Sequence, residues 1–352
     1  MNMCLRAAAI ALALTLLTGC STLLPQPKPA TGYEAYQPVD AVAQNAAMKR
    51  GVNIWANALR PDETQKPFDP SRHFKLIRQA GFSTVRLAWR AFEYMDESNK
   101  LKPDYLARMD EFVHSALDAG LIVIVDEHDY EFCAKDVAAC RVKLDAFWTQ
   151  IGERYKNLPN RVIFEMLNEP NQAMTAEIWN AQIPETLAVI RATNPTRNVI
   201  VGPGNWNGIE FLPKLVLPDD PHLIVTFHYY HPMEFTHQGA SWVPQYTKLG
   251  VAWGSPAEVD LMNKELDSVK AWGEANKRPI FLGEFGTIED GKMVDRVKWT
   301  SAMARGADAR GFSWAWWQFS NNMKVFDTDK DAWVEPILNA LIPEAKTAEA
   351  AH

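Results

Sequence analysis

Two glutamates have the surroundings that most clearly indicate chemistry. Glu169 lies in Asn168-Glu169-Pro170 at the end of one short apolar run, and Glu284 lies in Gly283-Glu284-Phe285-Gly286 at the end of another. Cleavage of a glycosidic bond requires two carboxyl groups that flank the anomeric carbon, one protonated to assist the leaving oxygen and one ionised. The pair therefore predicts glycosidic bond cleavage, provided that the fold brings both groups to opposite sides of one site.

Further polar side chains lie in or at the ends of other apolar runs. A guanidinium beside Glu284 would favour the ionised form of that carboxyl, and Arg86 could supply it. Amide, imidazole and phenol groups can hydrogen-bond a substrate or a nucleophile. Some of these residues also have a structural alternative, because Asp126 could cap a helix and His128 could be a hydrogen-bonded core histidine. The supporting candidates are Arg86, His128, Asn168, His228 and Tyr230.

The elements that must position these groups follow from a repeated pattern. Short apolar runs alternate with longer amphipathic stretches, which predicts a parallel sheet covered by helices. Eight such units over roughly 290 residues favour an α/β fold, a (β/α)8 TIM barrel with a single catalytic domain. The rival, an open doubly wound sheet, lacks support because no glycine-rich phosphate turn follows the first run. The predicted strands are Gly51–Asn57, Thr84–Arg90, Ile122–Asp129, Val162–Asn168, Val199–Gly204, Leu223–Tyr230, Pro279–Phe285 and Phe312–Phe319.

The beginning of the chain has the pattern of a targeting segment. The apolar run Ala7–Leu17 is shorter than the ~20 residues of a membrane-spanning helix, and residues 1–19 are typical of a secretory signal peptide. The run closes with Leu17-Thr18-Gly19-Cys20, which resembles the bacterial lipobox, and Ser21 after it favours the outer membrane. We expect an exported protein anchored to the bacterial outer membrane by lipid on Cys20, or a secreted one if the lipobox is not used.

The remaining segments divide the chain into three parts. Residues 20–48 are rich in proline and alanine and predict a flexible tether. Residues 49–343 form the predicted catalytic domain, and residues 344–352 form a polar, alanine-containing tail. In the domain only Cys133 and Cys140 remain, which in an oxidising compartment suggests one local disulfide, with two free cysteines as the alternative.

Composition narrows the class of partner. The net charge of −7 gives no support for nucleic-acid binding, which usually needs a basic excess. Thirteen tryptophans is a high count. Most should fill the core, because large aromatic side chains dominate the buried area, and a minority in an open groove would form flat platforms for sugar rings. Trp55, Trp206 and Trp242 are the candidates because each lies at a strand end or in a loop beyond one. Trp148 and Trp179 lie in helical runs and should be packing residues.

Taken in order, these motifs resemble glycoside hydrolase family 5, within the clan of retaining (β/α)8 glycosidases. The resemblance covers residues 50 to 340. It implies that Glu169 is the acid/base, that Glu284 is the nucleophile, and that Trp317 forms the floor of the sugar subsite. The matching stretches are Arg50-Gly51-Val52-Asn53, Val85-Arg86-Leu87, Asp126-Glu127-His128, Leu167-Asn168-Glu169-Pro170, His228-Tyr229-Tyr230, Gly283-Glu284-Phe285-Gly286 and Trp314-Ala315-Trp316-Trp317.

The resemblance leaves the substrate less certain than the reaction. Asp129 replaces a second histidine found in some relatives, and Trp316 stands where tyrosine is common. The stretch Phe235–Ala240 is similar to a loop of cellulase-like members, which favours β-1,4-glucan as the substrate without excluding mixed-linkage glucan or mannan. Endo action is the default expectation. The implied partner is a β-linked polysaccharide, with no cofactor, no metal and a monomeric chain.

Two other classes of function compete with this interpretation. A metal-dependent enzyme on the same fold would recruit Asp126, His128 and His228, although no tight ligand motif joins them. A non-catalytic polysaccharide-binding lipoprotein would not require both glutamates. A hydrolysis assay on soluble glucans and mannans, with and without a chelator, separates the three.

Overall fold

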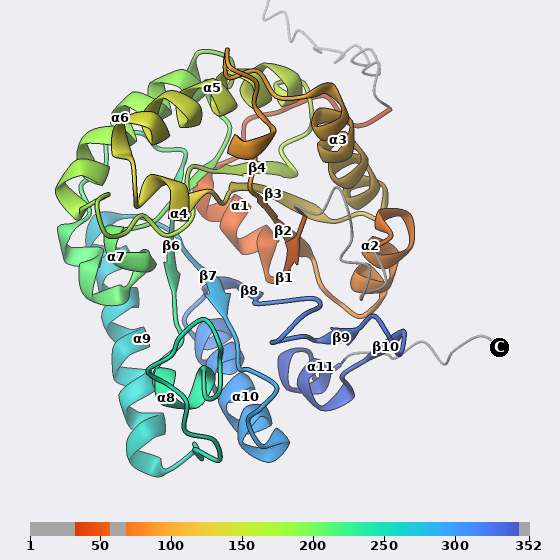
Figure 1. Ribbon diagram of the computed structural model, residues 1–352, viewed down its shortest axis with the longest axis vertical. Coiled ribbons are helices and arrows are strands. Elements are labelled where there is room, and N and C mark those ends of the chain that lie inside the picture. Colours follow the sequence, from red (N-terminus) through yellow and green to blue (C-terminus); the bar gives the residue numbers. More distant parts are fainter. Residues whose placement is uncertain (1–31, 57–67, 345–352) are drawn as a thin grey trace, which may run out of the picture.

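Eight parallel strands close into a barrel in the computed structural model, which describes residues 32–56 and 68–344 (Figure 1). Each strand pairs with its neighbour in chain order, and β1 pairs with β8 to close the ring. The predicted (β/α)8 barrel in a single domain is therefore confirmed. The strands are Arg50–Trp55 (β1), Thr84–Trp89 (β2), Ile122–Glu127 (β3), Val162–Glu165 (β4), Val199–Val201 (β5), Leu223–His228 (β6), Ile280–Phe285 (β7) and Ser313–Trp316 (β8).

Helices surround the barrel and cover its outer face (Figure 1). Local sequence sets the start of Pro256–Asn276, where Ser255 and Glu258 form a reciprocal capping box. Pro256 occupies the first helical position, where its missing N–H removes no hydrogen bond of the helix. No described helix is both long and apolar enough to span a bilayer. The helices are Ala41–Met48 (α1), Pro70–Gln79 (α2), Pro103–Asp118 (α3), Tyr130–Cys133 (α4), Val137–Tyr155 (α5), Ala176–Arg191 (α6), Gly204–Asn207 (α7), Met233–Thr236 (α8), Pro256–Asn276 (α9), Met293–Ala309 (α10) and Glu335–Leu341 (α11), with 3₁₀ turns at Phe92–Tyr94 and Ile209–Lys214.

The barrel interior is apolar near the strand starts and polar near their carboxyl ends. Successive side chains of a strand point to opposite faces, so residues two apart share a face. In β3, Ile122 and Ile124 belong to the inner apolar cluster, whereas Val123 and Val125 pack in the layer beneath the helices. The same inner cluster contains one or more residues from five further strands: Ile163, Ile200, Ile224, Phe281 and Ala315. Buried polar residues then follow at the carboxyl ends, where the candidate site residues lie.

Helix α1 packs under the amino-terminal end of the barrel. Ala41 and Met48 are buried in the inner apolar cluster. Asn45 Nδ2 donates to the carbonyl of Ile280 at 3.0 Å, and the Ser313 hydroxyl donates to Asn45 Oδ1 at 2.5 Å. The prediction of a flexible tether over residues 20–48 is therefore wrong for Ala41–Met48, because α1 buries apolar side chains against the strand starts.

The strand predictions were right in number and place but too long at several carboxyl ends. β3 ends at Glu127 rather than Asp129, and β4 ends at Glu165 rather than Asn168. In these places the chain leaves the ladder as soon as the site residues begin. A small antiparallel pair, β9 (Phe326–Asp327) with β10 (Ala332–Trp333), was not predicted.

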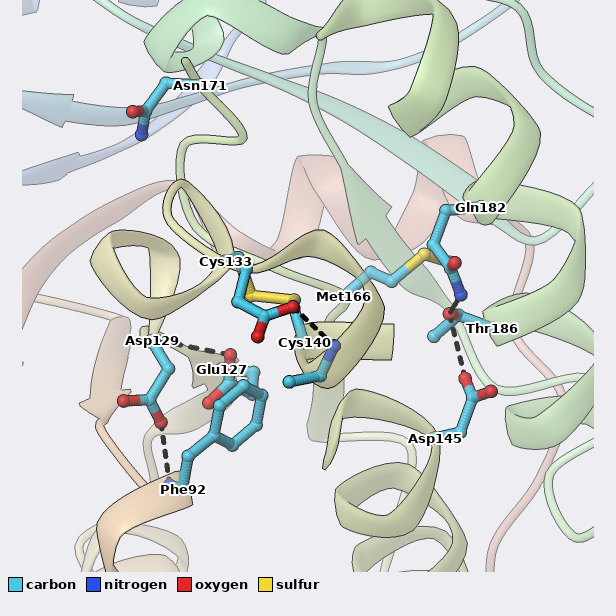
Figure 2. Close-up of a disulfide and its surroundings, with 12 residues drawn as sticks. Phe92, Glu127, Asp129, Cys133, Cys140, Asp145, Met166, Asn171, Gln182 and Thr186 are labelled. Atoms are coloured by element: carbon cyan, nitrogen blue, oxygen red, sulfur yellow. Dashed lines mark hydrogen bonds between the residues drawn. A yellow bond between two sulfur atoms is a disulfide. The ribbon is translucent and has the colours of Figure 1, made fainter. Parts of the chain in front are cut away.

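A disulfide joins Cys133 at the end of α4 to Cys140 in the first half of α5, as the sequence suggested (Figure 2). Both cysteines are fully buried. Beside them lie Glu127 of β3 and Asp129, whose carboxylate accepts a hydrogen bond from the Phe92 amide at 2.8 Å. The disulfide thus links the segment that follows β3 covalently to α5.

Candidate active site

Glu169 and Glu284 meet at the carboxyl end of the barrel. Glu284 lies in β7, and Glu169 lies in the loop after β4 with a left-handed φ of 42°. One carboxylate oxygen of each, together with a ring nitrogen of His228, lies within 4.8 Å of the others. The fold thus brings the two predicted carboxyl groups together at one site.

Arg86 connects the charged groups of this end of the barrel. It is fully buried on β2, and its Nη1 lies 2.8 Å from Glu284 Oε1. Its Nε and Nη2 make a two-pronged contact with Glu165, at 2.6 and 2.9 Å. Nη2 also donates to Asn168 Oδ1 at 2.7 Å and lies 3.1 Å from Asp126 Oδ2. Such bidentate, charge-assisted bonds fix the orientation of both partners.

Both oxygens of Glu284 accept hydrogen bonds. Arg86 donates to Oε1, and the Tyr230 hydroxyl donates to Oε2 at 2.9 Å. Burial raises the pKa of Glu284 above its ordinary value, while His228 and Arg86 act in the opposite direction. The two donors orient the carboxylate and stabilise it in the ionised form that attack on carbon requires.

Glu169 has a different environment. Its Oε1 lies 2.7 Å from His228 Nδ1, whereas Arg86 donates to Glu284. Burial raises the pKa of Glu169 to about 8, with Arg86 and Asn168 opposing that rise. A carboxyl that stays protonated near neutral pH suits a general acid.

His128 contacts both the ion network and an aromatic platform. Its Nδ1 lies 2.6 Å from Asp126 Oδ2, and its ring stacks on Trp317 with centroids 5.5 Å apart. Burial lowers the pKa of His128 to about 3, so the imidazole is neutral at neutral pH. The supporting candidates Arg86, His128, Asn168, His228 and Tyr230 therefore all lie within one connected set of contacts.

The four candidate tryptophans line one cleft at the mouth of the barrel, with a volume of about 720 Å³. Trp55, Trp206 and Trp242 are 37%, 43% and 51% exposed, which leaves a face of each free for a ligand. Trp317 also lines the cleft, where its ring stacks on His128 and meets Trp55 edge-on. By contrast, Trp148 and Trp179 are fully buried and donate to backbone carbonyls.

Sequence reasoning missed Glu165 and Asn53. Glu165 forms the bidentate pair with Arg86, and Asn53 Oδ1 accepts from Arg86 Nη1 at 2.9 Å. A signal existed, because both are polar residues inside otherwise apolar strands and both share the inward register of their strand. Tyr130 and His237 also line the cleft without having been predicted.

Position 283 in β7, a glycine, has no room for a side chain, because Thr226 and His228 of β6 lie against it. A Cβ there would lie 2.5 Å from Thr226 Oγ1 and 2.9 Å from His228 Nε2. The glycine therefore lets β6 bring His228 close to Glu284. Cys20, the predicted lipidation site, lies outside the described residues.

The family model, the sequence relatives and the similar solved structures all point to the same family. Residues 42–323 match the family described as cellulase (glycosyl hydrolase family 5). Endoglucanase H of Acetivibrio thermocellus is 32% identical over 277 residues, covering 76% of this chain and 30% of that protein. The solved structure of endoglucanase Cel5A from Thermotoga maritima superposes with a TM-score of 0.83 at 37% identity, covering 86% of this chain and 100% of that one. The cellulose synthase subunit Z of Clostridioides difficile gives 0.79 at 35% identity, over 84% and 99%.

The relatives differ from this chain in length, and one of them has been solved with two kinds of sugar ligand. The chain spans 30% and 36% of the length of the first two curated relatives, and 59% and 49% of the next two. Structures of the T. maritima enzyme include complexes with mannotriose and with cellobiose.

Proposed function

The chain belongs to glycosyl hydrolase family 5, the cellulase family, and we propose that it is an endo-acting hydrolase that cleaves β-1,4-linked glucan with retention of configuration. The endoglucanases among its relatives support the endo action and the glucan substrate. The open cleft, with exposed tryptophans among its lining residues, fits an extended polymer.

The reaction follows from the two carboxyl environments. The Glu284 carboxylate attacks the anomeric carbon while Glu169 gives its proton to the leaving glycosidic oxygen, so a glycosyl ester forms and the sugar–sugar bond breaks. Glu169, now ionised, then takes a proton from water as that water attacks the same carbon. The ester bond breaks and Glu284 returns to its carboxylate form.

The observation that carries retention is the closeness of the carboxyl groups. Oxygens of Glu169 and Glu284 lie within 4.8 Å of each other. Retaining enzymes hold their carboxyl groups ~5–5.5 Å apart, whereas inverting enzymes need ~6.5–9.5 Å to admit a water between carboxylate and sugar. A separation of this order supports direct attack by Glu284 rather than activation of a water.

Proton NMR of the first products tests retention directly. Hydrolysis of cello-oligosaccharides should release the β-anomer first, with the α-anomer growing in only by mutarotation. Early release of the α-anomer would mean inversion and would remove Glu284 as the nucleophile.

The matched variant test is Glu284→Gln. The change is nearly isosteric, so thermal unfolding should be little altered, while kcat should fall on the order of 10⁴-fold or more, as for other lost nucleophiles. Wild-type-like turnover in this variant would exclude Glu284 from the mechanism.

The substrate assignment has its own experiment. A panel of carboxymethyl-cellulose, mixed-linkage β-glucan and mannan should give the highest kcat/KM on the β-1,4-glucan. Mannan is the second candidate because the T. maritima relative has been crystallised with mannotriose. Release of reducing ends should survive a chelator, and loss of activity on chelation would instead support the metal-dependent alternative.

The cellular placement is part of the same proposal. The lipobox-like Leu17-Thr18-Gly19-Cys20 supports an exported chain with a lipid anchor on Cys20, acting on polysaccharide from the outer membrane. Secretion without an anchor is the alternative. The chain is expected to act as a monomer.

A further inference from the structure

Three consecutive residues at the edge of the cleft adopt the left-handed conformation. Asn205, Trp206 and Asn207 in α7 have φ values of 57°, 58° and 57°. Residues other than glycine visit this region singly, because it costs on the order of 1–2 kcal/mol each. Asparagine tolerates it better than most residues, but tryptophan does not. A run of three persists only when its surroundings fix it, and such strain gathers at functional sites.

The surroundings of this turn tie it to the catalytic loop. The amide of Trp206 donates to the carbonyl of Pro170, the residue that follows Glu169, at 3.2 Å. The turn also packs closely: a Cβ at Gly202 would lie 2.3 Å from Asn207 Oδ1, and one at Gly204 would lie 3.0 Å from Ala176. The turn is therefore held rigidly beside the loop that carries Glu169.

Because of this backbone conformation, the neighbouring side chains of Trp206 and Asn207 lie in the cleft and in the protein interior, respectively. Trp206 lies in the cleft with 43% of its surface exposed, and Asn207 is fully buried. Asn207 Nδ2 lies 3.3 Å from His228 Nε2. The other ring nitrogen of the same histidine, Nδ1, lies 2.7 Å from Glu169 Oε1. One imidazole thus links Asn207 to Glu169.

The chemistry of the amide determines which nitrogen of His228 carries the proton. An amide NH₂ group can only donate, so the Nε2 that faces it must be the acceptor. A neutral imidazole then carries its single proton on Nδ1 and donates it to Glu169 Oε1. Burial lowers the pKa of His228 to about 4, which keeps the ring neutral at neutral pH.

We propose that Asn207 is a positioning residue that sets the tautomer of His228 and so keeps the acidic proton of Glu169 on its other oxygen, available to the leaving group. With the opposite tautomer, Nδ1 would accept a hydrogen bond, and the carboxyl proton of Glu169 would be held by the histidine instead. The consequence for catalysis rests on the proposed function, whereas the tautomer itself does not.

Other charged groups around His228 act on the ring from several elements. They shift the pKa of His228, whereas Asn207 contacts Nε2 and so bears on which nitrogen of the neutral ring carries the proton. The groups that face the ring are Arg86 on β2, His128 after β3, Glu165 on β4, Glu169 after β4 and Glu284 on β7.

The first measurement is made on the unaltered protein. Histidine ring ¹H–¹⁵N correlation spectra distinguish the two neutral tautomers, and a His228→Asn variant identifies the signal of His228. We expect a protonated Nδ1 and an unprotonated Nε2 at neutral pH. A protonated Nε2 in the wild type would overturn the proposal. This readout does not require a glucan substrate, so failure of the proposed function leaves it intact.

The second measurement uses Asn207→Asp, which preserves shape and tolerates the left-handed backbone. A carboxylate oxygen facing Nε2 should draw a proton onto that nitrogen, and kcat on β-glucan should fall by about 10²-fold, the lower range of general acid catalysis. KM should change little, because Asn207 is fully buried and lies behind the histidine. An unchanged His228 spectrum or an unchanged kcat would each contradict the proposal.

Two further variants complete the design. Asn207→Gly suits the same φ without strain and removes the donor, so both tautomers of His228 should then be observed; a single Nδ1-protonated form would contradict the role of Asn207. Asn99→Asp makes the same chemical change at φ 58° in a turn outside the cleft. It should leave both the His228 spectrum and kcat unchanged.

Discussion

Arg86 holds the site together through a single fully buried side chain. It contacts Glu165 and Glu284 directly, and Asn168 and Asn53 through their side-chain oxygens. Glu169 lies outside this direct set and bonds to His228 instead. Burial raises the pKa of both carboxyls, and Arg86 bonds directly to Glu284 while His228 bonds to Glu169.

This difference predicts the pH dependence. A general acid works only while protonated, and burial raises the pKa of Glu169 to about 8. We therefore expect kcat/KM to fall as the pH rises through about 8. The acidic limb should come from Glu284, which must be ionised, and should lie above the ordinary carboxyl value because burial raises its pKa. Initial rates across the pH range measure both limbs.

Glu169→Gln identifies the alkaline limb. On an aryl glycoside whose leaving group needs no proton, this variant should keep part of its activity and show no decline near pH 8. A decline that persisted at the same pH in the variant would assign the limb to another group.

Motifs at the strand ends predicted the two glutamates that the structure brings together. Asn53 and Glu165 were harder to predict, since each is a single polar residue within an apolar run. Counting in steps of two along a strand would have found Glu165, because it shares a face with Ile163 of the inner cluster. The left-handed turn at Asn205–Asn207 could not be predicted, because its backbone is imposed by distant packing against Ala176 and Pro170.

At the level of elements, the segment after β3 carries both a residue that lines the cleft and one end of the disulfide. His128 lies in the cleft, and α4 follows with Cys133, which is joined to Cys140 in α5 (Figure 2). The disulfide closes a sequence separation of 7. So short a loop restricts the unfolded chain only modestly.

The double variant Cys133→Ala/Cys140→Ala tests its contribution. We expect a loss of about 2 kcal/mol in the free energy of unfolding, the entropic value for a loop this short. Denaturant titrations measure it. Reductant should destabilise the wild type by a similar amount and leave the variant unchanged, and equal sensitivity of both would argue against the disulfide.

At the scale of the whole molecule, the length of the substrate in the cleft determines how much binding is lost when one tryptophan is replaced. Alanine at Trp55, Trp206 or Trp242 should weaken binding by ~1–3 kcal/mol, the value of burying a large apolar side chain. Kinetics on a long glucan should be affected more than kinetics on a short oligosaccharide that does not reach the altered site. Equal losses on both substrates would mean that these tryptophans serve packing.

A matched comparison is available in the same chain. Trp179 is fully buried, so its replacement should lower the unfolding temperature and affect both substrates alike. The three exposed tryptophans should leave the unfolding temperature nearly unchanged.

The predicted anchor is tested outside the barrel. Cys20→Ala should move the protein from the membrane fraction to the soluble fraction, with activity on soluble glucan unchanged. Continued association of the variant with membranes would show that Cys20 is not the anchor.

The closure of the barrel by its first and last strands also constrains when the chain can fold. β1 pairs with β8, and Asn45 of α1 bonds to Ser313, a sequence separation of 268. Contacts so distant form late, because a long loop must close before they contribute. A chain emerging amino-terminus first therefore cannot complete its core until nearly all of it is available. A loose chain during synthesis is also the state that can be threaded through an export channel, if the predicted signal peptide directs it to one.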